Sequence, residues 1–334
     1  MPILDTEILW RPAALNSVAV PAQNGGRMAF SALTSGVKNN LFPDVSQSER
    51  DAGLLTWRKA FVHVASQADT ALLNLRLFLD ALTPGGDFVL FQPGTQTDTQ
   101  DQIAGRPYGV GALYAPLTAG AVQLRIAGED NANYATLQPF RLGDLLRVSD
   151  RPSTGGAGNE EWVTVTGILY GPDYATVDFT PALVNGYATA NTLVASVHAP
   201  PDLVAACSGM VVTSTGGSFT PAGNLIAHNK GAVADDWTLT FTSASQYTAA
   251  GTVSGALAAL GSVAADYAPL NPATGTPFFT VKASAWGGAF AANDAVRFST
   301  APAAIPLWYR RQVPPGTASL ANDFCSLAII GESA

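Results

Sequence analysis

The chain has 334 residues, of which 47% are hydrophobic and 13% are charged, with 32 Gly, 22 Pro and 2 Cys. This length allows two or three domains, and so low a charged fraction excludes coiled coils, salt-bridged helical bundles and charged disordered tails. The formal net charge of −8 leaves no basic face of the kind that nucleic acid binding needs.

The N-terminal residues do not resemble a secretion signal. Asp5 and Glu7 stand where a signal peptide would carry basic residues, and no apolar core of useful length follows. We therefore expect the protein to stay in the compartment where it is made. The uncharged run 237–265 is long enough to span a membrane, but its Thr, Ser and Gly content favours a strand followed by a loop, so no membrane insertion is expected.

Alternation of apolar and polar residues, which places successive side chains on opposite faces of a strand, is the main local signal. In 72–82 it puts Leu73, Leu75, Leu77 and Leu79 on one face. The same pattern predicts strands in 87–94, 121–128, 161–171, 175–183, 237–247, 278–286 and 295–300.

Helical signals are few. Ser46 and Glu49 form a capping pattern that satisfies the first amides of a helix, which predicts a short helix near 46–59. A weaker candidate is 253–267, which Gly255 and Gly261 interrupt.

The composition changes near 138–142, after which Ala, Thr, Gly and Val dominate. We therefore expect an N-terminal β domain over 1–140 and a β-sandwich region over 141–334. The predicted fold class is all-β, with two β-sandwich-like domains and at most one or two short helices. Residues 143–152 and 293–302 echo each other through Asp144 and Asp294, which indicates either two related β units or two similar turns.

The histidines and cysteines form no recognisable site. His63, His198 and His228 are far apart in the sequence and have no partner at metal-ligand spacing, so structural roles are expected. Cys207 and Cys325 lie in no CxxC or Cys/His cluster. Two free, buried thiols are favoured over one disulfide.

The acidic residues suggest two weak alternatives. Asp98 and Asp101 lie among Thr and Gln oxygens but lack the pattern of a calcium loop, which favours a polar loop. A glycan hydrolase would need Asp235, Asp236 and Asp266 to converge in a groove. No nucleophile elbow, phosphate loop or dinucleotide-binding motif occurs, so we expect no catalytic, metal or cofactor site and no enzyme activity.

The low charge suggests surface that is buried against other subunits, because permanent interfaces are depleted in charge. Trp, Tyr and Arg anchor interfaces most often. We therefore place candidate contacts on the helix after the FPD turn and near the C-terminus, at Trp57, Arg58, Lys59, Trp308, Tyr309, Arg310 and Arg311. The alternative for these residues is ordinary strand packing, and the six Trp of the chain are expected in cores rather than on a sugar platform.

Three stretches, 24–65, 74–100 and 278–334, resemble virion structural proteins of tailed bacteriophages with long tails. The resemblance implies a structural part of the tail or baseplate, made in the cytoplasm of the host bacterium and resident in the virion. Its partners would be copies of itself and neighbouring virion proteins. Alternatives are a receptor-binding tail protein that recognises a host surface glycan, a capsid decoration protein, and a tail glycan hydrolase.

Overall fold

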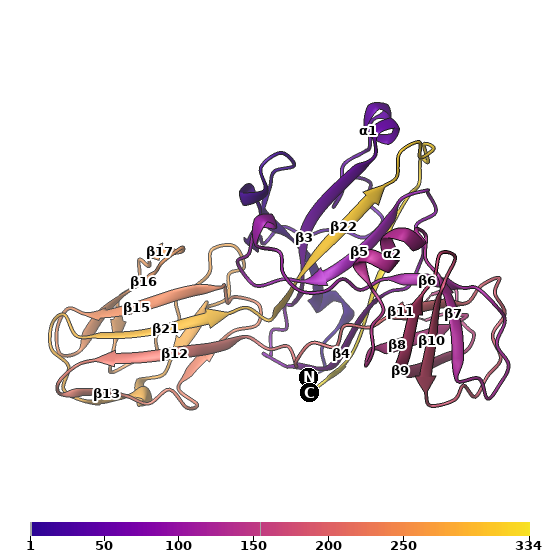
Figure 1. Ribbon diagram of the computed structural model, residues 1–334. Helices are drawn as coiled ribbons and strands as arrows, with labels where there is room; N and C mark the ends of the chain where they lie inside the picture. The colour runs from indigo at the N-terminus through magenta and orange to yellow at the C-terminus, as the bar shows by residue number, and fades with distance from the viewer. Residues whose placement is uncertain (1, 154) are drawn as a thin grey trace.

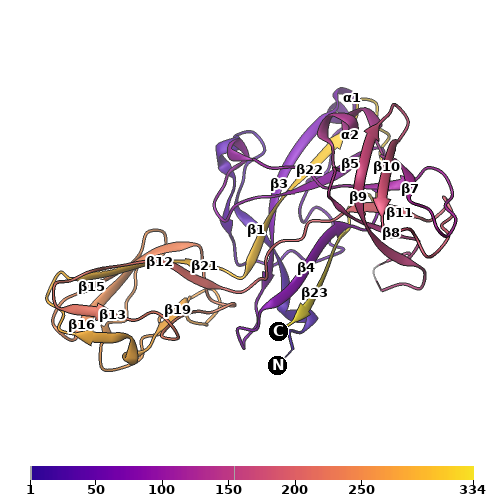
Figure 2. The same cartoon turned by 60° about the horizontal axis from the view of Figure 1, so that its bottom comes forward.

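The computed structural model describes residues 2–153 and 155–334 and consists of three units (Figure 1). Both ends of the chain build a central unit, residues 2–106 and 303–334. A barrel unit, residues 107–198, and a distal unit, residues 205–302, are inserted into it one after the other. The distal unit is joined through two neighbouring stretches that lead into and out of its sheet (Figure 2).

The central unit contains a five-stranded antiparallel sheet and a separate strand pair. The sheet order is β2 (Asn24–Met28), β1 (Ile8–Asn16), β3 (Leu54–Val64), β22 (Ala304–Val313) and β5 (Phe88–Pro93). The pair is β4 (Leu72–Leu79) with β23 (Leu327–Ser333). The unit also contains three short 3-10 turns, Asp5–Glu7, Pro21–Gln23 and Gln100–Gln102.

Alternation in β4 agrees with the predicted inward face for Leu75, Leu77 and Leu79, which are at most 1% exposed. Leu73 departs from it and is only partly buried. The reason is the next residue, Asn74, whose φ of 52° accompanies a shift in the register with β23. Such a bulge changes the face to which side chains point.

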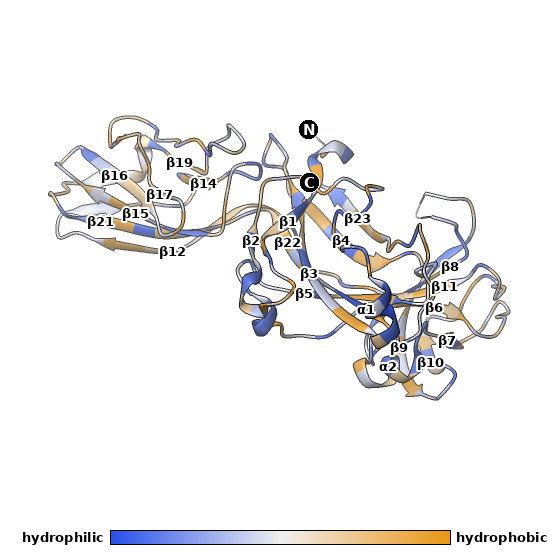
Figure 3. Cartoon of the chain, turned by 90° about the horizontal axis from the view of Figure 1, so that it is seen from above, coloured by the Kyte–Doolittle hydropathy of each residue, from blue (hydrophilic) through white to orange (hydrophobic). Residues whose placement is uncertain are grey.

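The predicted helix start is confirmed, but the predicted end is wrong. Helix α1 runs over Gln47–Ala52, and the Ser46 side chain accepts from the Glu49 amide while Glu49 reaches back to the Ser46 amide. The helix ends at Gly53, whose φ of 81° suits glycine. Residues 54–59, expected to be helical, belong to β3. Figure 3 shows α1 as a strongly hydrophilic segment.

The barrel unit is a closed barrel of six strands, in which each strand pairs with two neighbours and none is left as an edge. Its strands are β6 (Val110–Leu113), β7 (Gln123–Ala127), β8 (Leu145–Ser149), β9 (Glu160–Tyr170), β10 (Ala175–Thr180) and β11 (Leu193–Ser196). The unit also holds helix α2 (Asn131–Leu137), capped by Asp130; the sequence analysis did not predict this helix.

Aromatic contacts dock the barrel unit on the central unit. Phe88 and Leu90 on β5 belong to the same apolar cluster as the barrel interior, and Phe88 meets Tyr134 of α2 edge to face. On the outer face of β4, Phe78 contacts Trp162 of β9 in the same way. These contacts are apolar, so they hold the barrel unit by burial.

The distal unit is a main sheet with two strand pairs beside it. The sheet order is β12 (Ala206–Thr213), β21 (Ala295–Ala301), β15 (Asp235–Phe241), β16 (Gln246–Gly251) and β17 (Gly255–Ala256), with β18 (Gly261–Ser262) also on β16. The pairs are β13 (Gly217–Phe219) with β20 (Trp286–Gly288) and β14 (Leu225–Ala227) with β19 (Phe279–Val281), and a 3-10 turn spans Ala283–Ala285.

Two local expectations in the distal unit are corrected. Residues 237–247, predicted as one strand, form a hairpin of β15 and β16 with a turn between them. The helix candidate 253–267 consists of β17, β18 and turns, since Gly255 has a φ of 73° that a helix does not allow.

The expected mostly β architecture is confirmed, with 43% strand, 8% helix and two short α-helices among the described residues. The arrangement is not clearly two sandwiches, because one sheet closes into a barrel. The composition change at 138–142 lies between α2 and β8, within the barrel unit. Strands on both sides of the expected boundary at 140 therefore share one sheet.

The echo between Asp144 and Asp294 reflects a shared turn. Each Asp carboxylate accepts from the amide three residues earlier, at Arg141 (2.7 Å) and Ala291 (2.8 Å). The residue before each Asp, Gly143 or Asn293, has a positive φ. However, β8 precedes its hairpin partner β9, whereas β21 follows its partner β15. The echo is therefore a local turn before a strand in two different topologies.

Within the part of the chain that the structure describes, no helix is long and apolar enough to cross a membrane.

Candidate functional site

The two groups of residues predicted to make contacts lie side by side on adjacent strands of the central sheet. The first group is on β3, not on the expected helix, because α1 ends before it. The second is on β22. The register pairs are Trp57 with Arg310, Arg58 with Tyr309, and Lys59 with Trp308, and Arg311 lies opposite Thr56.

Most of these side chains are buried within the chain itself. Trp308 is 0% exposed, Tyr309 and Lys59 are 3% exposed, and Arg58 and Arg310 are 9% exposed. Trp57 and Arg311 are partly buried. The surface that this group offers to a partner is therefore limited to Trp57 and Arg311.

Lys59 and Trp308 both bind Asp98. Lys59 Nζ lies 2.6 Å from Asp98 Oδ1 and also donates to the carbonyl oxygens of Gly26 (2.7 Å) and Asp98 (3.0 Å). Trp308 Nε1 donates to Asp98 Oδ2 at 2.8 Å. Burial lowers the pKa of Lys59, and the Asp98 carboxylate opposes that shift. The ammonium group thus has all three of its donors paired, which is what a buried charge requires.

The Trp308 ring leaves no room for side chains beside it. A Cβ on Gly25 would lie 2.5 Å from Trp308 Cη2, and one on Gly94 would lie 2.9 Å from Trp308 Cδ1. Gly25 also has a φ of 105°, which L-residues rarely adopt. The loops that contain Gly25 and Gly94 therefore pack directly against the Trp308 ring.

The candidate calcium loop with Asp98 and Asp101 lies at this cluster. Both Asp98 carboxylate oxygens are taken by Lys59 and Trp308, and Asp101 accepts from Thr99 Oγ1 at 2.5 Å. Over residues 2–153 and 155–334, no group of three His, Cys, Asp or Glu side chains is arranged to hold a metal ion. The loop serves as a counter-charge for Lys59.

At the other end of the same strands, cations lie against aromatic rings. The Arg310 guanidinium lies 6.0 Å from the centroid of Trp57 and 5.9 Å from that of Phe88. Arg311 lies 4.7 Å from the centroid of Phe42. Each of these cations therefore covers an aromatic face of its own chain, an arrangement worth about 0.5–2 kcal/mol in general.

Two of the three histidines meet at the joint between the central and distal units. Asn229, which is 0% exposed, lies at the centre of this joint. Its amide and its side-chain Nδ2 donate to Asp69 Oδ1 (2.7 Å) and to the Thr70 carbonyl (2.9 Å). Its Oδ1 accepts from the Ala205 amide (2.8 Å), and its carbonyl is 2.8 Å from His63 Nε2. Every polar group of this asparagine therefore has a partner.

His228 extends the same network. Its Nδ1 lies 2.7 Å from Asp69 Oδ2, and its Nε2 lies 2.7 Å from Thr280 Oγ1. The order carboxylate, imidazole, hydroxyl is that of a hydrolase triad. The sequence gives no signal of it, because Thr280 meets His228 through the pairing of β14 with β19 and Asp69 reaches His228 only at the joint.

His63 and His198 are suited to structural roles. Burial lowers the pKa of His63 and of His198 to about 4, so both are neutral at pH 7. His198 packs against Tyr108 with ring centroids 5.2 Å apart.

The carboxylates considered for glycan hydrolysis have separate structural partners. Asp235, 4% exposed, accepts from Thr252 Oγ1 and from the amides of Val253 and Ser254. Burial alone would raise the pKa of Asp235, but these hydrogen bonds hold it below its ordinary value. Asp236 accepts from Ser299, and Asp266 accepts from the Ala283 amide.

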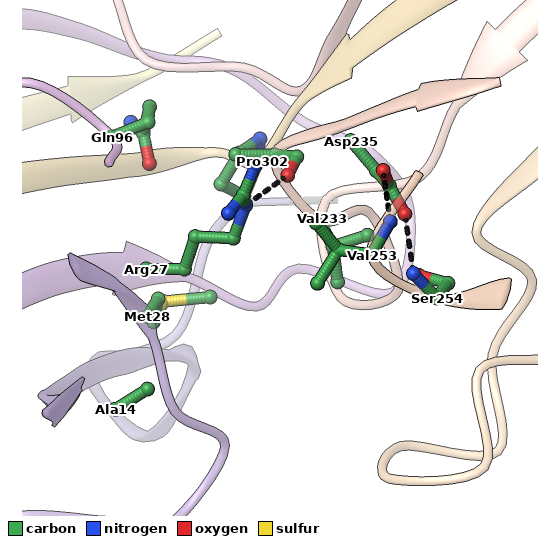
Figure 4. A pocket seen from close by; sticks show the side chains of 10 residues that line it. Ala14, Arg27, Met28, Gln96, Val233, Asp235, Val253, Ser254 and Pro302 are labelled. Carbon is green, nitrogen blue, oxygen red and sulfur yellow. Dashed lines mark hydrogen bonds between the residues drawn. The ribbon is translucent and has the colours of Figure 1, made fainter. Parts of the chain in front are cut away.

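A crevice of about 200 Å³ lies where β2 meets the distal unit (Figure 4). Arg27 reaches across it and donates from Nε to the Ala234 carbonyl at 2.8 Å. Asp235, Val253 and Ser254 line the other wall. Sites for drug-sized ligands usually measure about 300–1,000 Å³, so this crevice is better suited to joining two units than to holding a ligand.

Both cysteines are free and partly buried. Cys207 lies on β12, and Cys325 lies just before β23. Burial raises the pKa of Cys207 to about 12 and that of Cys325 to about 11. Neither thiol is therefore activated at neutral pH.

No family model, curated protein or solved structure matches the chain.

Replacement of Lys59 by Met should destabilise the central unit strongly. It leaves the Asp98 carboxylate buried without its cation, and such a loss generally costs about 3–5 kcal/mol. Urea unfolding followed by tryptophan fluorescence measures this. The control is Lys38→Met, which removes the exposed Lys38–Asp44 pair and should leave the midpoint nearly unchanged. Equal midpoints for the two variants would contradict the assigned role of Lys59.

Replacement of Asn229 by Ala should loosen the joint without unfolding the distal unit. The Ala205 amide then loses its acceptor, and each buried group left unpaired costs about 1–3 kcal/mol. Hydrogen exchange should show faster exchange at Ala205 and unchanged exchange in β15. Asn224→Ala, a change inside the distal unit, serves as the control, and loss of protection throughout β15 in Asn229→Ala would refute a role confined to the joint.

Proposed function

We propose that the protein is a structural component of a bacteriophage virion, in the tail or baseplate. It acts by assembling with copies of itself and with neighbouring virion proteins. It is made in the cytoplasm of the host bacterium and then resides in the particle. In this proposal the central and distal units are sandwich-like modules, with bounds that differ from the expected 1–140 and 141–334, and the barrel unit is a third module inserted between them.

The observation that carries the proposal is the uncharged, exposed rim of the distal unit. Residues 252–265, here called the apolar rim, contain no charged residue. Val253 is 57% exposed and Leu260 is 62% exposed, and most Ala residues between them are exposed as well. Exposed apolar surface without charge is typical of surfaces that are covered by a partner.

The opposite edge of the distal sheet supports the same proposal. Strand β12 is an edge strand, and its residues include no Lys, Glu, Asp or Arg. Charged residues are a common means of preventing edge strands from pairing with other chains. Val211 on this strand is 54% exposed. An edge without charges, interrupted only by the bulge between Ser208 and Val211, suits a protein that pairs with other subunits.

The distribution of the resembling stretches adds support. Residues 24–65 and 74–100 and the end of the third stretch, 304–334, contribute strands to the central unit. The resemblance to virion structural proteins thus falls mostly on one folded unit, although its stretches are far apart in the sequence. Residues 278–302 of that stretch belong to the distal unit.

Charges introduced into the apolar rim should impair assembly. We expect the double variant Ala258→Asp, Leu260→Asp to enter phage particles at least about tenfold less than the wild type, a change equivalent to about 1.4 kcal/mol. A tagged copy supplied during infection, quantified in purified particles, measures this. The matched control is Val184→Asp, Leu169→Asp, two residues of the barrel unit that are 78% and 73% exposed.

The location of the tagged protein and its binding to polysaccharide also distinguish the alternative functions. Imaging of the tag places the protein at the head, for a decoration protein, or at the tail. Binding of the purified protein to host surface polysaccharide would favour the receptor-binding alternative. Absence of the tagged wild type from particles would contradict the proposal.

A second candidate function is hydrolysis, and one observation favours it. Asp69, His228 and Thr280 have the atom order of a triad in which Thr280 would be the nucleophile. The side chains of His228 and Asp69 are 20% and 29% exposed. In the structural proposal the same hydrogen bonds only fix the joint between two units.

Ester hydrolysis distinguishes these two roles. If the joint is only structural, the purified protein should turn over p-nitrophenyl acetate no faster than Thr280→Val, and neither should be labelled by a fluorophosphonate probe. Labelling of the wild type that is lost in both Thr280→Val and His228→Gln, with both variants folded, would establish the hydrolase.

A further inference from the structure

Strand β12 leaves one side of the distal sheet open. It is an edge strand whose sheet partner is β21. Within residues 2–153 and 155–334, the backbone of Ala206–Thr213 forms no hydrogen bond with any other element. Every second residue of an edge strand directs its amide and carbonyl away from the neighbouring strand. These groups are therefore available to one further strand.

The apolar core of the distal unit is incompletely covered at the same edge. Cys207, Met210 and Val212 pack against that core but remain partly exposed. The side chain of Val211 is 54% exposed. A strand added beside β12 would cover these side chains and so remove apolar surface from water. The occupant that fits this edge is therefore an uncharged, extended segment.

A bulge divides the edge into two runs. Gly209 has a φ of 64°, and the register with β21 shifts between Ser208 and Val211. A bulge locally disrupts a ladder, so a continuous new ladder fits only one side of it. On the C-terminal side, Val211, Val212 and Thr213 are all β-branched, and such residues favour strands. The new pairing is therefore centred on this run.

The charges of the chain favour a second copy as the occupant. Strand β12 contains no Asp, Glu, Lys or Arg, so two β12 strands can lie side by side without like charges opposite each other. A foreign strand with the Lys residues that commonly protect edges would find no counter-charge on β12.

The net charge of the distal unit acts in the same direction. Residues 205–302 include four acidic and three basic residues, hence a formal net charge of −1, whereas the whole chain carries −8. A large net charge keeps protein molecules apart. Two copies therefore meet with the least repulsion through their distal units.

We propose that β12 of one copy pairs with β12 of a second copy around a twofold axis perpendicular to the sheet, which joins two distal sheets into one. This axis makes the two strands antiparallel and gives both copies the same contacts. The proposal names the partner of the β12 edge and rests on the self-assembly proposed above. The pairing needs no other virion protein, so it is measurable on the purified chain.

Sedimentation velocity of the full chain, from micromolar to millimolar concentration, tests this pairing. The wild type should form a dimer and no larger species. Val211→Lys places a charge where the second copy would cover it and should raise the dimer dissociation constant at least about tenfold. Ala244→Lys adds the same charge to the exposed turn between β15 and β16 and should dimerise like the wild type.

Hydrogen exchange gives a second measurement that locates the contact. Exchange of the β12 amides should slow as the wild-type concentration rises, whereas exchange in β15, an inner strand, should not change. A wild type that stays monomeric at every concentration would overturn the proposal. Equal dissociation constants for the wild type and a folded Val211→Lys would overturn it too, and so would a ring or other oligomer larger than a dimer.

Incorporation into particles separates this proposal from the proposed function. A tagged copy that enters particles while the purified chain stays monomeric refutes the β12 pairing and leaves the virion role standing, with the edge covered by a different virion protein. A purified chain that dimerises through β12 but is absent from particles supports the pairing and refutes the virion role alone.

Discussion

The pairing of β3 with β22 is the constraint on which the rest of the structure depends. It joins Leu54–Val64 to Ala304–Val313 in ten consecutive register pairs, although the two strands are separated by 239 intervening residues (65–303). Closing so long a loop costs conformational entropy. The ladder, the buried Lys59–Asp98 pair and the Trp308 side chain offset that cost. The barrel unit begins beside β5 of this sheet and the distal unit ends where β22 begins, whereas the chain between the two units runs along β4.

Both inserted units are attached by apolar packing together with hydrogen bonds. The barrel unit docks through aromatic rings such as Phe88 and Phe78 and through the Arg106–Asp144 ion pair. The distal unit packs Ala227 and Ala232 on the central core and is oriented by the hydrogen bonds of Asn229 and Arg27. Apolar burial is not directional, whereas hydrogen bonds have a preferred geometry. The distal unit therefore has a defined orientation despite a slender connection, which suits a module that presents its far edges to other subunits.

The sequence predicts local structure well and long-range structure poorly, for physical reasons. Alternation identifies β4, β9 and β21, and the Ser46 cap identifies the start of α1, because these signals lie within a few residues. The central sheet could not be predicted, since its strands come from both ends of the chain. The composition change at 138–142 marks no unit boundary because the barrel unit closes across it.

The predicted contact residues show the same limit. Trp, Tyr and Arg anchor interfaces between proteins and also anchor cores. What decides the case for Trp308 is the pair of glycines, Gly25 and Gly94, that leave room for its ring. Glycines more than 200 residues away carry no signal that links them to a tryptophan. The joint at Asn229 was missed for the same reason, as its partners come from three separate segments.

The surface of the chain carries few charges for two separate reasons. First, some of the charged residues are buried, because Lys59, Arg58 and Arg310 occupy interior positions where each must be paired or stacked. Second, the distal unit is poor in charged residues, which make up only 7 of its 98 residues from 205 to 302. Of those seven, Asp235 is buried, and Asp236, Asp266 and Asp294 accept hydrogen bonds from their own unit. Few charges therefore remain to keep the rim and the β12 edge apart from another protein. A distal unit whose rim and β12 edge are left neutral suits assembly better than a free existence in solution.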